Sequence, residues 1–243
     1  MDADVCIVGG GLAGLSAGIF TARADLDTVV VDDGGQILRR NAHLENYPGF
    51  PCGVDARRLL EQTTEQARVA GCRFRDGLVT DVEQADDGFE VRVDDGSTTT
   101  VRRVVAASWS DASYLDGTGV ETETRGSKTF VPVDHAGRTN VEGLYAAGRL
   151  ADQYHQAVVC AGHGATVGRT IVHESDVDFY HDWVTPEGYF TGRDRDVPPA
   201  TEEISDAERR ARDERAREAM RAYTEPLDDE PTMHPSVDLD AED

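Results

Sequence analysis

A glycine-rich turn between an apolar run and a helix-forming segment is the feature that most limits what this chain can fold into. The run VCIV at 5–8 is typical of a buried strand, and GGGLAG at 9–14 follows it directly. Gly9 permits a tight turn, Gly11 lets the backbone approach a pyrophosphate, and Gly14 brings helix and strand close together. The helix N-terminus then offers unpaired N–H groups and a positive dipole end to an anion. The order strand, turn, helix therefore predicts a dinucleotide site.

The second predicted strand ends on a carboxylate. Residues 12–23 suit a helix, and the run TVVV at 28–31 is a second buried strand that ends in Asp32. At that spacing an acid accepts a hydrogen bond from the ribose 2′-hydroxyl of an adenosine and repels a 2′-phosphate. The alternative is that Asp32 and Asp33 only begin a polar turn before Gly34-Gly35. The glycine turn ahead of it favours the ribose role.

The charge of the chain is strongly acidic. Its 243 residues hold 47 Asp and Glu against 24 Lys and Arg, a formal net charge of -23, and Lys128 is the only lysine. This composition is typical of a halophilic protein, because the Debye length falls to roughly 3 Å at 1 M salt and self-repulsion is screened. A like-charged surface argues against nucleic acid or an anionic membrane as a partner. A docking face for a basic protein is the alternative.

The cysteines and the apolar segments bear on the compartment. We expect a cytoplasmic protein, since Asp2 and Asp4 stand where a basic leader would begin and no long apolar segment follows. The four cysteines are scattered without a C-x-x-C pair, so no disulfide framework is expected. Cys160 and His163 share one predicted helix, but a metal ion would need more ligands, and we predict no metal site.

Four further segments resemble the thioredoxin reductase family of FAD-dependent pyridine nucleotide-disulfide oxidoreductases. These are GGQ at 34–36, LENYPGF at 44–50, TNVEGLYAAG at 139–148 and HQAVVCAGHG at 155–164. With the opening glycines they cover about residues 4–173 in family order. The resemblance implies FAD as the cofactor.

The resemblance also implies a fold. We expect an α/β chain whose Rossmann-like FAD-binding domain, residues 1–175, has a central parallel sheet and a small antiparallel β-meander layer. Its two sequence halves, about 1–115 and 125–175, follow each other directly. Turns at 86–88 and 94–96 place the meander between 79 and 101. Residues 176–243 form an acidic C-terminal helical extension, with one helix at about 205–222 and a disordered end.

Site residues follow from the resemblance position by position. Contacts to the cofactor are implied for Gly9, Gly11, Leu12, Ala13, Gly14, Asp32, Gly35, Gln36, Asn46, Gly148, Arg149, Gln156 and Ala157. The backbone of Val79 is expected to meet the adenine. Arg39, Arg40, Asn46 and His155 are the candidates near the flavin ring, and Arg40-Asn41 is similar to the RN motif of a branch that oxidises small dithiols.

Three departures separate this chain from the family pattern. Where the family has A-T-G, the chain reads Ala107-Ser108-Trp109, and an indole cannot pass where a bare glycine backbone does. Arg149 stands where the family has an aspartate, so a group that can only donate hydrogen bonds replaces an acceptor. The family's nicotinamide-binding domain, with its redox-active cysteine pair, is missing between the two halves.

Two functions therefore compete. The first is an FAD-dependent oxidoreductase resembling thioredoxin reductase but unable to bind its own NADPH or to use a redox dithiol. Such an enzyme takes electrons from a small dithiol or a protein donor. The alternative is a non-catalytic FAD-binding, nucleotide-binding or partner-binding module derived from the flavin domain. A homodimer built with the tail is left open by the sequence.

Overall fold

Short runs of buried β-branched residues build a parallel sheet. The computed structural model describes residues 1–179 and 181–237. In it β1 (Ala3–Val8) lies between β2 (Thr28–Asp32) and β6 (Thr98–Ala106), with β3 (Arg73–Asp76) beyond β2 and β9 (Leu144–Ala146) beyond β6. All of these neighbours pair in parallel. The carboxyl ends of these strands, where α/β folds bind ligands, therefore share one edge.

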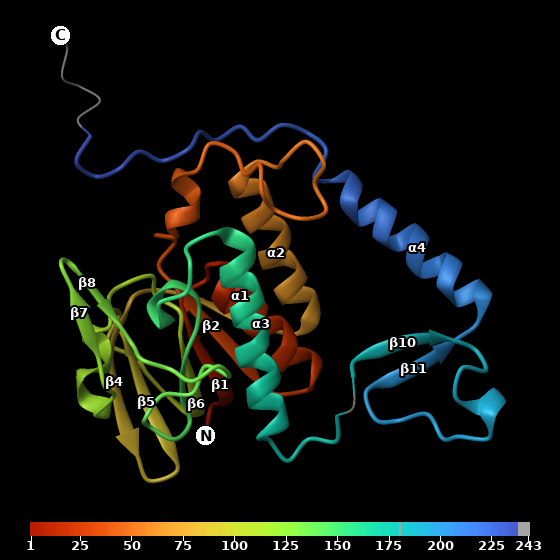
Figure 1. Ribbon diagram of the computed structural model, residues 1–243, viewed down its shortest axis with the longest axis horizontal. Coiled ribbons are helices and arrows are strands. Elements are labelled where there is room, and N and C mark those ends of the chain that lie inside the picture. Colours follow the sequence, from red (N-terminus) through yellow and green to blue (C-terminus); the bar gives the residue numbers. More distant parts are fainter. Residues whose placement is uncertain (180, 238–243) are drawn as a thin grey trace.

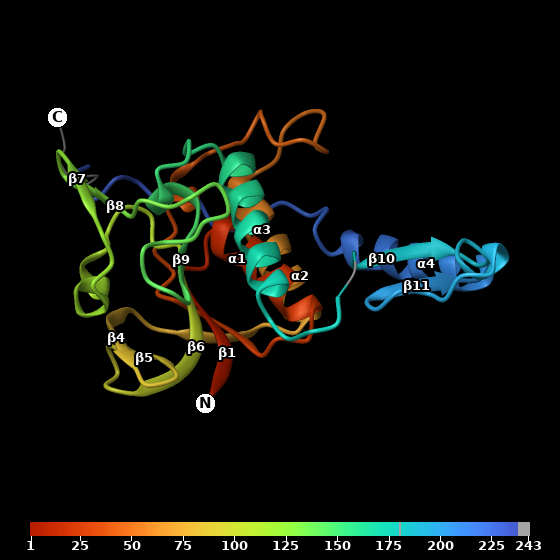
Figure 2. The same ribbon diagram turned by 60° about the horizontal axis from the view of Figure 1, so that its bottom comes forward.

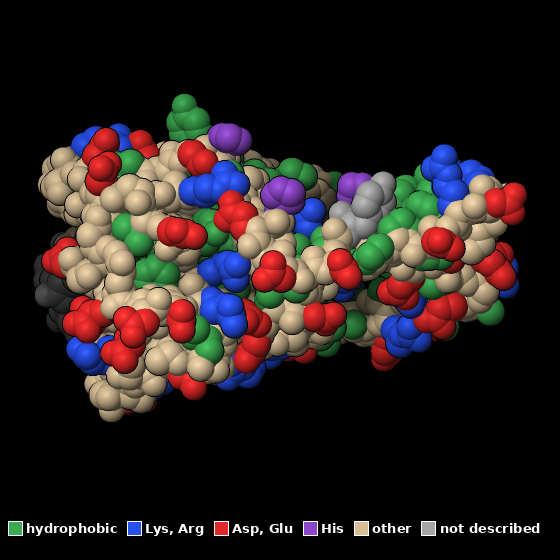
Figure 3. Space-filling model, turned by 90° about the horizontal axis from the view of Figure 1, so that it is seen from below, with side chains coloured by type: hydrophobic (Ala, Val, Ile, Leu, Met, Phe, Trp, Pro, Cys, Tyr) green, Lys and Arg blue, Asp and Glu red, His purple; other side chains and the backbone are tan. Residues whose placement is uncertain are grey.

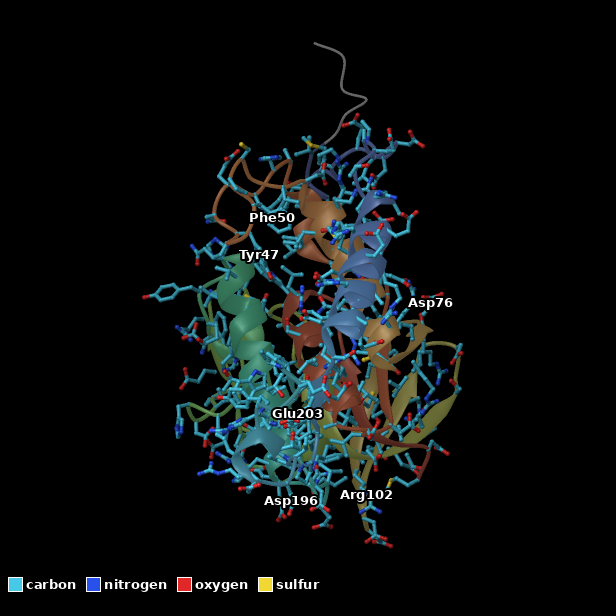
Figure 4. All side chains as sticks on the ribbon, turned by 90° about the vertical axis from the view of Figure 1, so that its right-hand side faces the viewer. Tyr47, Phe50, Asp76, Arg102, Asp196 and Glu203 are labelled. Atoms are coloured by element: carbon cyan, nitrogen blue, oxygen red, sulfur yellow. The ribbon has the colours of Figure 1, made fainter. Side chains whose placement is uncertain are left out.

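The strand β6 belongs to two layers at once. Its first part pairs antiparallel with β5 (Gly88–Val93), which pairs antiparallel with β4 (Val79–Ala85), while its second part joins β1 and β9. The predicted fold class is confirmed, and the meander is continuous with the main sheet. β6 is one unbroken strand, because exposed Arg102 (Figure 4) and half-buried Arg103 sit within it without interrupting its pairing.

Alternate residues of each strand face opposite sides of the sheet. On one side Val5, Ile7, Val30 and Val105 pack with the helices. On the other side the next residues along the same strands pack with Leu115 and other residues of the 112–151 segment. Both faces of the parallel strands are thus covered, as their nearly unbroken apolar sequences require.

Three helices cover one face of the sheet (Figure 1): α1 (Leu12–Arg23), α2 (Ala56–Ala70) and α3 (Ala157–His173). Glycines let α3 lie directly on α1. A Cβ at Gly164 would stand 1.9 Å from the carbonyl oxygen of Ala13, and one at Gly168 would stand 2.6 Å from that of Ala17. The second sequence half is therefore packed against the glycine-turn helix of the first.

The two halves are joined by a short irregular segment. After β6 come the 3-10 helix η2 (Ser113–Thr118) and the hairpin of β7 (Glu123–Arg125) and β8 (Lys128–Phe130), before the chain returns to the sheet at β9. The helix η2 packs against β4, and Phe130 is buried. This hairpin occupies the sequence position at which the resemblance implies an additional domain.

The C-terminal extension lies beside this body (Figures 1 and 2). It holds β10 (Trp183–Pro186), which pairs in parallel with β11 (Thr201–Ile204), the short η4 (Thr191–Arg193) and the helix α4 (Asp206–Arg221). Ser205 caps α4, at the start of the helix predicted for 205–222, and the helix buries none of its residues. After α4 the chain runs back across the amino end of α2 (Figure 1), where the Arg58 guanidinium donates to the Glu225 carbonyl at 2.6 Å. The division into domains and the disordered end remain predictions.

Charges of both signs are interspersed over the surface (Figure 3), with Asp and Glu spread across body and extension alike. Across residues 1–179 and 181–237, none of the helices has the length and apolarity needed to cross a membrane. The four cysteines are free thiols, of which Cys6 and Cys72 are buried.

Candidate cofactor site

A cavity of about 620 Å³ lies at the carboxyl edge of the parallel strands. That size is in the range of sites for large cofactors, roughly 300–1,000 Å³. Its walls come from both sequence halves. They include residues 8–13, 31–33, 35–38, 77–80 and 107–109 with Arg40, Asp111, Ser113, Tyr114, Arg149, His155, Ala157 and Cys160.

The three motif glycines have separable roles. Gly9 has φ +106°, and a Cβ there would stand 2.8 Å from the Ala107 carbonyl oxygen, while a Cβ at Gly14 would stand 2.0 Å from the Gly9 carbonyl oxygen. These two glycines are required by the turn and by the packing of helix on strand. Gly11 differs, because a Cβ on it would meet nothing within 4 Å. Its missing side chain leaves room in the cavity, so that a pyrophosphate can approach the protein backbone closely.

Two helix N-termini face this cavity, and neither is capped by a side chain. The N-cap residues are Gly11 for α1 and Gln156 for α3, and no acidic residue stands in the first turn of either helix. The helices away from the cavity are capped instead, α2 by Asp55 and α4 by Ser205. Uncapped N–H groups and positive dipole ends at the cavity are suited to a diphosphate.

Asp32 is half-buried on the cavity wall at the end of β2. Its carboxylate accepts hydrogen bonds from the backbone N–H of Gly10 at 2.9 Å and of Gly34 at 3.3 Å, and from the side-chain amide of Gln36. Burial raises the pKa of Asp32, and the two backbone donors oppose that shift. The carboxylate is thus held in place as an acceptor at the wall.

Trp109 has a backbone conformation that favours glycine. Its φ is +57°, in the left-handed region that favours glycine, and the residue is half-buried on the cavity wall. The turn is fixed by Ser108, whose hydroxyl bonds the Tyr114 hydroxyl at 2.8 Å and the Asp111 carbonyl at 2.8 Å. The indole is therefore part of the wall, and the cavity beside the opening glycines stays open.

Arg149 also stands in the wall without filling the cavity. It is the second residue of the 3-10 helix η3 (Gly148–Ala151), and its guanidinium lies 4.7 Å from the ring centre of Phe130. The same group donates to the Gln153 carbonyl at 3.1 Å. Arg125 lies 4.3 Å from the same ring. The hairpin between the halves thus supplies the stacking partner that orients Arg149.

The 3-10 helix η1 (Ile37–Arg40) and the start of α3 also line the cavity. Arg40 and His155 both line it, and their place near the flavin ring stays a prediction. Behind them Tyr47 and Phe50 of the 41–55 loop pack toward the amino end of α3 with Ala157 and Ala161 (Figure 4). Asn46, on the same loop, is exposed and does not line the cavity.

Some of the residues predicted to contact the cofactor line the cavity, and others do not. Lining the cavity are Gly9, Gly11, Leu12, Ala13, Asp32, Gly35, Gln36, Arg149 and Ala157. Outside the lining are Gly14, Asn46, Gly148 and Gln156, together with Arg39 among the candidates near the ring. Gly148 lies behind the wall, where its N–H donates to His163 Nδ1 at 3.1 Å. Within the described chain no cluster of three or more metal-ligating side chains occurs.

Sequence reasoning missed Leu38, Ser113, Tyr114 and Cys160 as lining residues. Cys160 lies three residues after Ala157, which also lines the cavity, so helical periodicity offered a signal for it. Burial raises the pKa of its thiol and lowers the pKa of the His163 imidazole. Tyr114 reaches the cavity only because the 108–114 turn folds back, which local sequence does not reveal.

Comparisons with known proteins agree with this geometry. A family profile described as "Pyridine nucleotide-disulphide oxidoreductase" matches residues 56–164, and one described as "FAD binding domain" matches residues 4–44. Thioredoxin reductase of Rickettsia felis is 34% identical over 125 residues, which are 50% of this chain and 40% of that protein. Thioredoxin reductase of Listeria monocytogenes is 35% identical over 125 residues, 49% of this chain and 37% of that protein. The chain thus spans about 40% of the length of such relatives.

Solved structures show the same fold at low identity. A thioredoxin reductase from Gloeobacter violaceus has a TM-score of 0.62 and 19% identity, covering 71% of this chain and 95% of that one. An oxidoreductase from Agrobacterium tumefaciens has a TM-score of 0.65 and 16% identity, covering 72% of this chain and 98% of that one. The uncapped helix ends, the open face of Gly11 and the Asp32 carboxylate fit FAD, which is the cofactor of this cavity. The chain carries a thioredoxin reductase-like FAD-binding domain of the pyridine nucleotide-disulphide oxidoreductase type.

Proposed function

We propose that this protein is an FAD-dependent oxidoreductase that takes electrons from an external donor, either a small dithiol or a protein carrier. The observation that carries the proposal is the open cavity shared by both halves, which combines two uncapped helix N-termini with Arg40 and His155. The hairpin of β7 and β8 stands between the halves, and no C-x-x-C pair occurs in the sequence. An internal electron route through a second domain and a dithiol therefore has no support in this chain.

The chain's own residues hold the cofactor and set its surroundings. The amino ends of α1 and α3 bind the diphosphate, and Asp32 accepts a hydrogen bond from the adenosine ribose. FAD, when bound, supplies an acceptor for the two electrons and two protons that a dithiol loses on becoming a disulfide. The Arg40 guanidinium stabilises negative charge at its end of the cavity, and the His155 imidazole, exposed at the start of α3, can exchange a proton with the donor.

The test is a visible spectrum followed by an anaerobic reduction. We expect protein purified in high salt to show flavin bands near one equivalent, and we expect a dithiol such as dithiothreitol to bleach them while NADPH does not. Rapid bleaching by NADPH alone would overturn the external donor. Flavin that neither donor reduces would leave the non-catalytic module as the better description.

Gly11 gives a matched variant for the same experiment. Its φ of -78° suits any residue, and added side-chain atoms at its Cβ meet no protein group within 4 Å. Gly11→Val is therefore expected to fold and to lose the flavin bands, because the valine fills the space a diphosphate needs. Gly162→Val is the control, since its Cβ also meets nothing within 4 Å and lies away from the cavity lining. Equal flavin content in both variants would contradict the assigned cavity.

The proposal extends to the setting in which the protein works. A formal net charge of -23 with a single lysine supports a high-salt environment, where screening removes most self-repulsion. Four free thiols support a reducing compartment such as the cytoplasm. Stability and flavin content measured against salt concentration test the first point, and both are expected to rise with salt.

A further inference from the structure

The Asp32 carboxylate has one acceptor position left for a ligand. A carboxylate offers about four lone-pair sites, two on each oxygen. Oδ2 accepts from the Gly34 N–H at 3.3 Å and from the Gln36 side-chain amide, so both of its sites are used. Oδ1 accepts from the Gly10 N–H at 2.9 Å and retains one site. The ribose hydroxyl therefore has a single, defined partner atom.

The Gln36 amide can face Asp32 in two ways, and only one of them is favourable. With its NH2 group toward the carboxylate it donates, and with its carbonyl oxygen toward the carboxylate it repels. The Nε of Arg39 donates to Gln36 Oε1 at 2.7 Å. A guanidinium has no acceptor, so it selects the orientation that turns the NH2 group of Gln36 to Asp32.

Arg39 is itself held at its backbone. Its N–H donates to the Gln36 carbonyl at 3.0 Å, and its carbonyl accepts from the N–H of Thr232 at 3.0 Å. The side chain is half-buried and is not part of the cavity lining. Arg39 can thus influence a bound nucleotide through Gln36 without touching it.

From this arrangement we infer that Arg39 is a positioning residue for the adenosine ribose. Acting through the Gln36 amide, it holds Asp32 so that the free site on Oδ1 meets the ribose 2′-hydroxyl. This differs from the role near the flavin ring that the resemblance implied for Arg39. The inference rests on FAD binding and not on the proposed electron transfer.

The test compares FAD with its 2′-deoxyadenosine analogue, both titrated into the apoprotein by calorimetry. The unmodified protein is expected to bind FAD about tenfold more tightly, the effect of one hydrogen bond to a charged group. In Arg39→Met and Gln36→Met this preference is expected to fall to about twofold or less, because affinity for FAD drops and affinity for the analogue changes little.

Arg40→Met is the matched control. It removes the same charge from the neighbouring residue, which lines the cavity. A loss of positive charge weakens both ligands in parallel, so the preference for FAD should stay near the unmodified value. An unchanged preference in Arg39→Met and Gln36→Met would overturn the inference. Failure of the unmodified protein to bind either ligand would instead contradict the cofactor assignment, and failure of dithiol reduction would contradict only the proposed activity.

Discussion

The body and the C-terminal extension are held together by different forces. In the body β1 buries Val5, Cys6 and Ile7 completely, and α3 lies on α1 through glycine contacts. In the extension α4 buries no residue, and its side chains pair with each other instead, as Arg209 does with Asp213 at 3.0 Å. Exposed ion pairs are weakened by salt screening, whereas buried apolar packing has no charges to screen.

The two regions also differ in what they contribute to the cavity. A cavity that must hold a cofactor in one geometry needs walls fixed by packing, and its walls come from the body. The extension contacts the body through polar groups, among them the Arg23–Asp182 pair and the Thr232–Arg39 hydrogen bond, and through Val177 and Phe179, which pack against the body core. Only the second of these reaches η1, which forms part of the cavity wall. At this hydrogen bond the extension contacts a segment that lines the cavity.

The packing of the body gives the largest expected effect. Gly164→Ala puts a Cβ 1.9 Å from the Ala13 carbonyl oxygen, so α3 must move off α1. We expect a loss of about 3 kcal/mol in the free energy of unfolding and a loss of bound FAD. Chemical denaturation followed by flavin absorbance measures both. In the control Gly162→Ala nothing lies within 4 Å, and helix propensity should stabilise the protein by about 0.5–1 kcal/mol.

Glu203 tests whether the extension unfolds separately (Figure 4). Its carboxylate accepts from the Thr191 hydroxyl at 2.7 Å and from the backbone N–H of Gly188 at 3.0 Å, of Thr191 at 3.0 Å and of Phe190. These bonds, above all the one from the hydroxyl, lower its pKa to about 2. A lowered pKa stabilises the folded extension above the ordinary pKa of 4.5, and that contribution is lost as pH falls from there toward about 2. The rings of Trp183, Tyr189 and Phe190 contact one another in the extension, and their near-ultraviolet circular dichroism should fade over this range.

In Glu203→Gln that signal should be weak already at neutral pH and should lose its dependence on acid, while flavin absorbance stays constant. Glu187→Gln, another carboxylate of the extension that is exposed, is the control. Simultaneous loss of flavin and aromatic signals would show that body and extension unfold together and not as separate units.

Thr232 tests the contact between the regions. Thr232→Pro removes the N–H that donates to the Arg39 carbonyl at 3.0 Å, whereas Thr232→Ala keeps it. One backbone hydrogen bond is worth about 1 kcal/mol, so the proline variant should bind FAD about fivefold more weakly than the alanine variant. Calorimetric titration of both apoproteins measures the ratio. Equal affinities would mean that η1 keeps its position without the extension.

The smallest effect is expected on the surface of α4. Arg209→Gln removes ion pairs with Asp213 at 3.0 Å and Asp206 at 3.5 Å, both exposed. The free energy of unfolding should fall by no more than about 0.5 kcal/mol, and the melting temperature should fall accordingly. In about 1 M salt the difference from the unmodified protein should disappear. Adding Asp213→Asn to the variant should recover part of the loss. A shift that persists in high salt would show that α4 is held by packing.

Much of the body could be predicted from the sequence. The glycine turn, the run ending in Asp32 and the motifs at 139–148 and 155–164 each combine a fixed spacing with a backbone requirement, and the fold and the cofactor are confirmed. Spacing works here because a turn such as that at Gly9, with φ +106°, accepts few residues other than glycine.

The features of the fold and of the site that could not be predicted depend on contacts between residues far apart in the sequence. Arg149 is oriented by Phe130, which lies in the hairpin between the halves, and no local pattern connects the two. The parallel pairing of β10 with β11 joins segments separated by a loop that contains η4. The departure at Trp109 was visible in the sequence, but its left-handed backbone and its place in the wall were not.

The tryptophan at position 109 also provides a fluorescent probe inside the cavity wall. The chain holds two tryptophans, one in the cavity wall at position 109 and one in the extension at position 183. Flavins absorb where indoles emit, so occupancy of the cavity should quench the emission of Trp109. With Trp183→Phe the remaining fluorophore becomes an intrinsic, label-free reporter of cofactor arrival and departure.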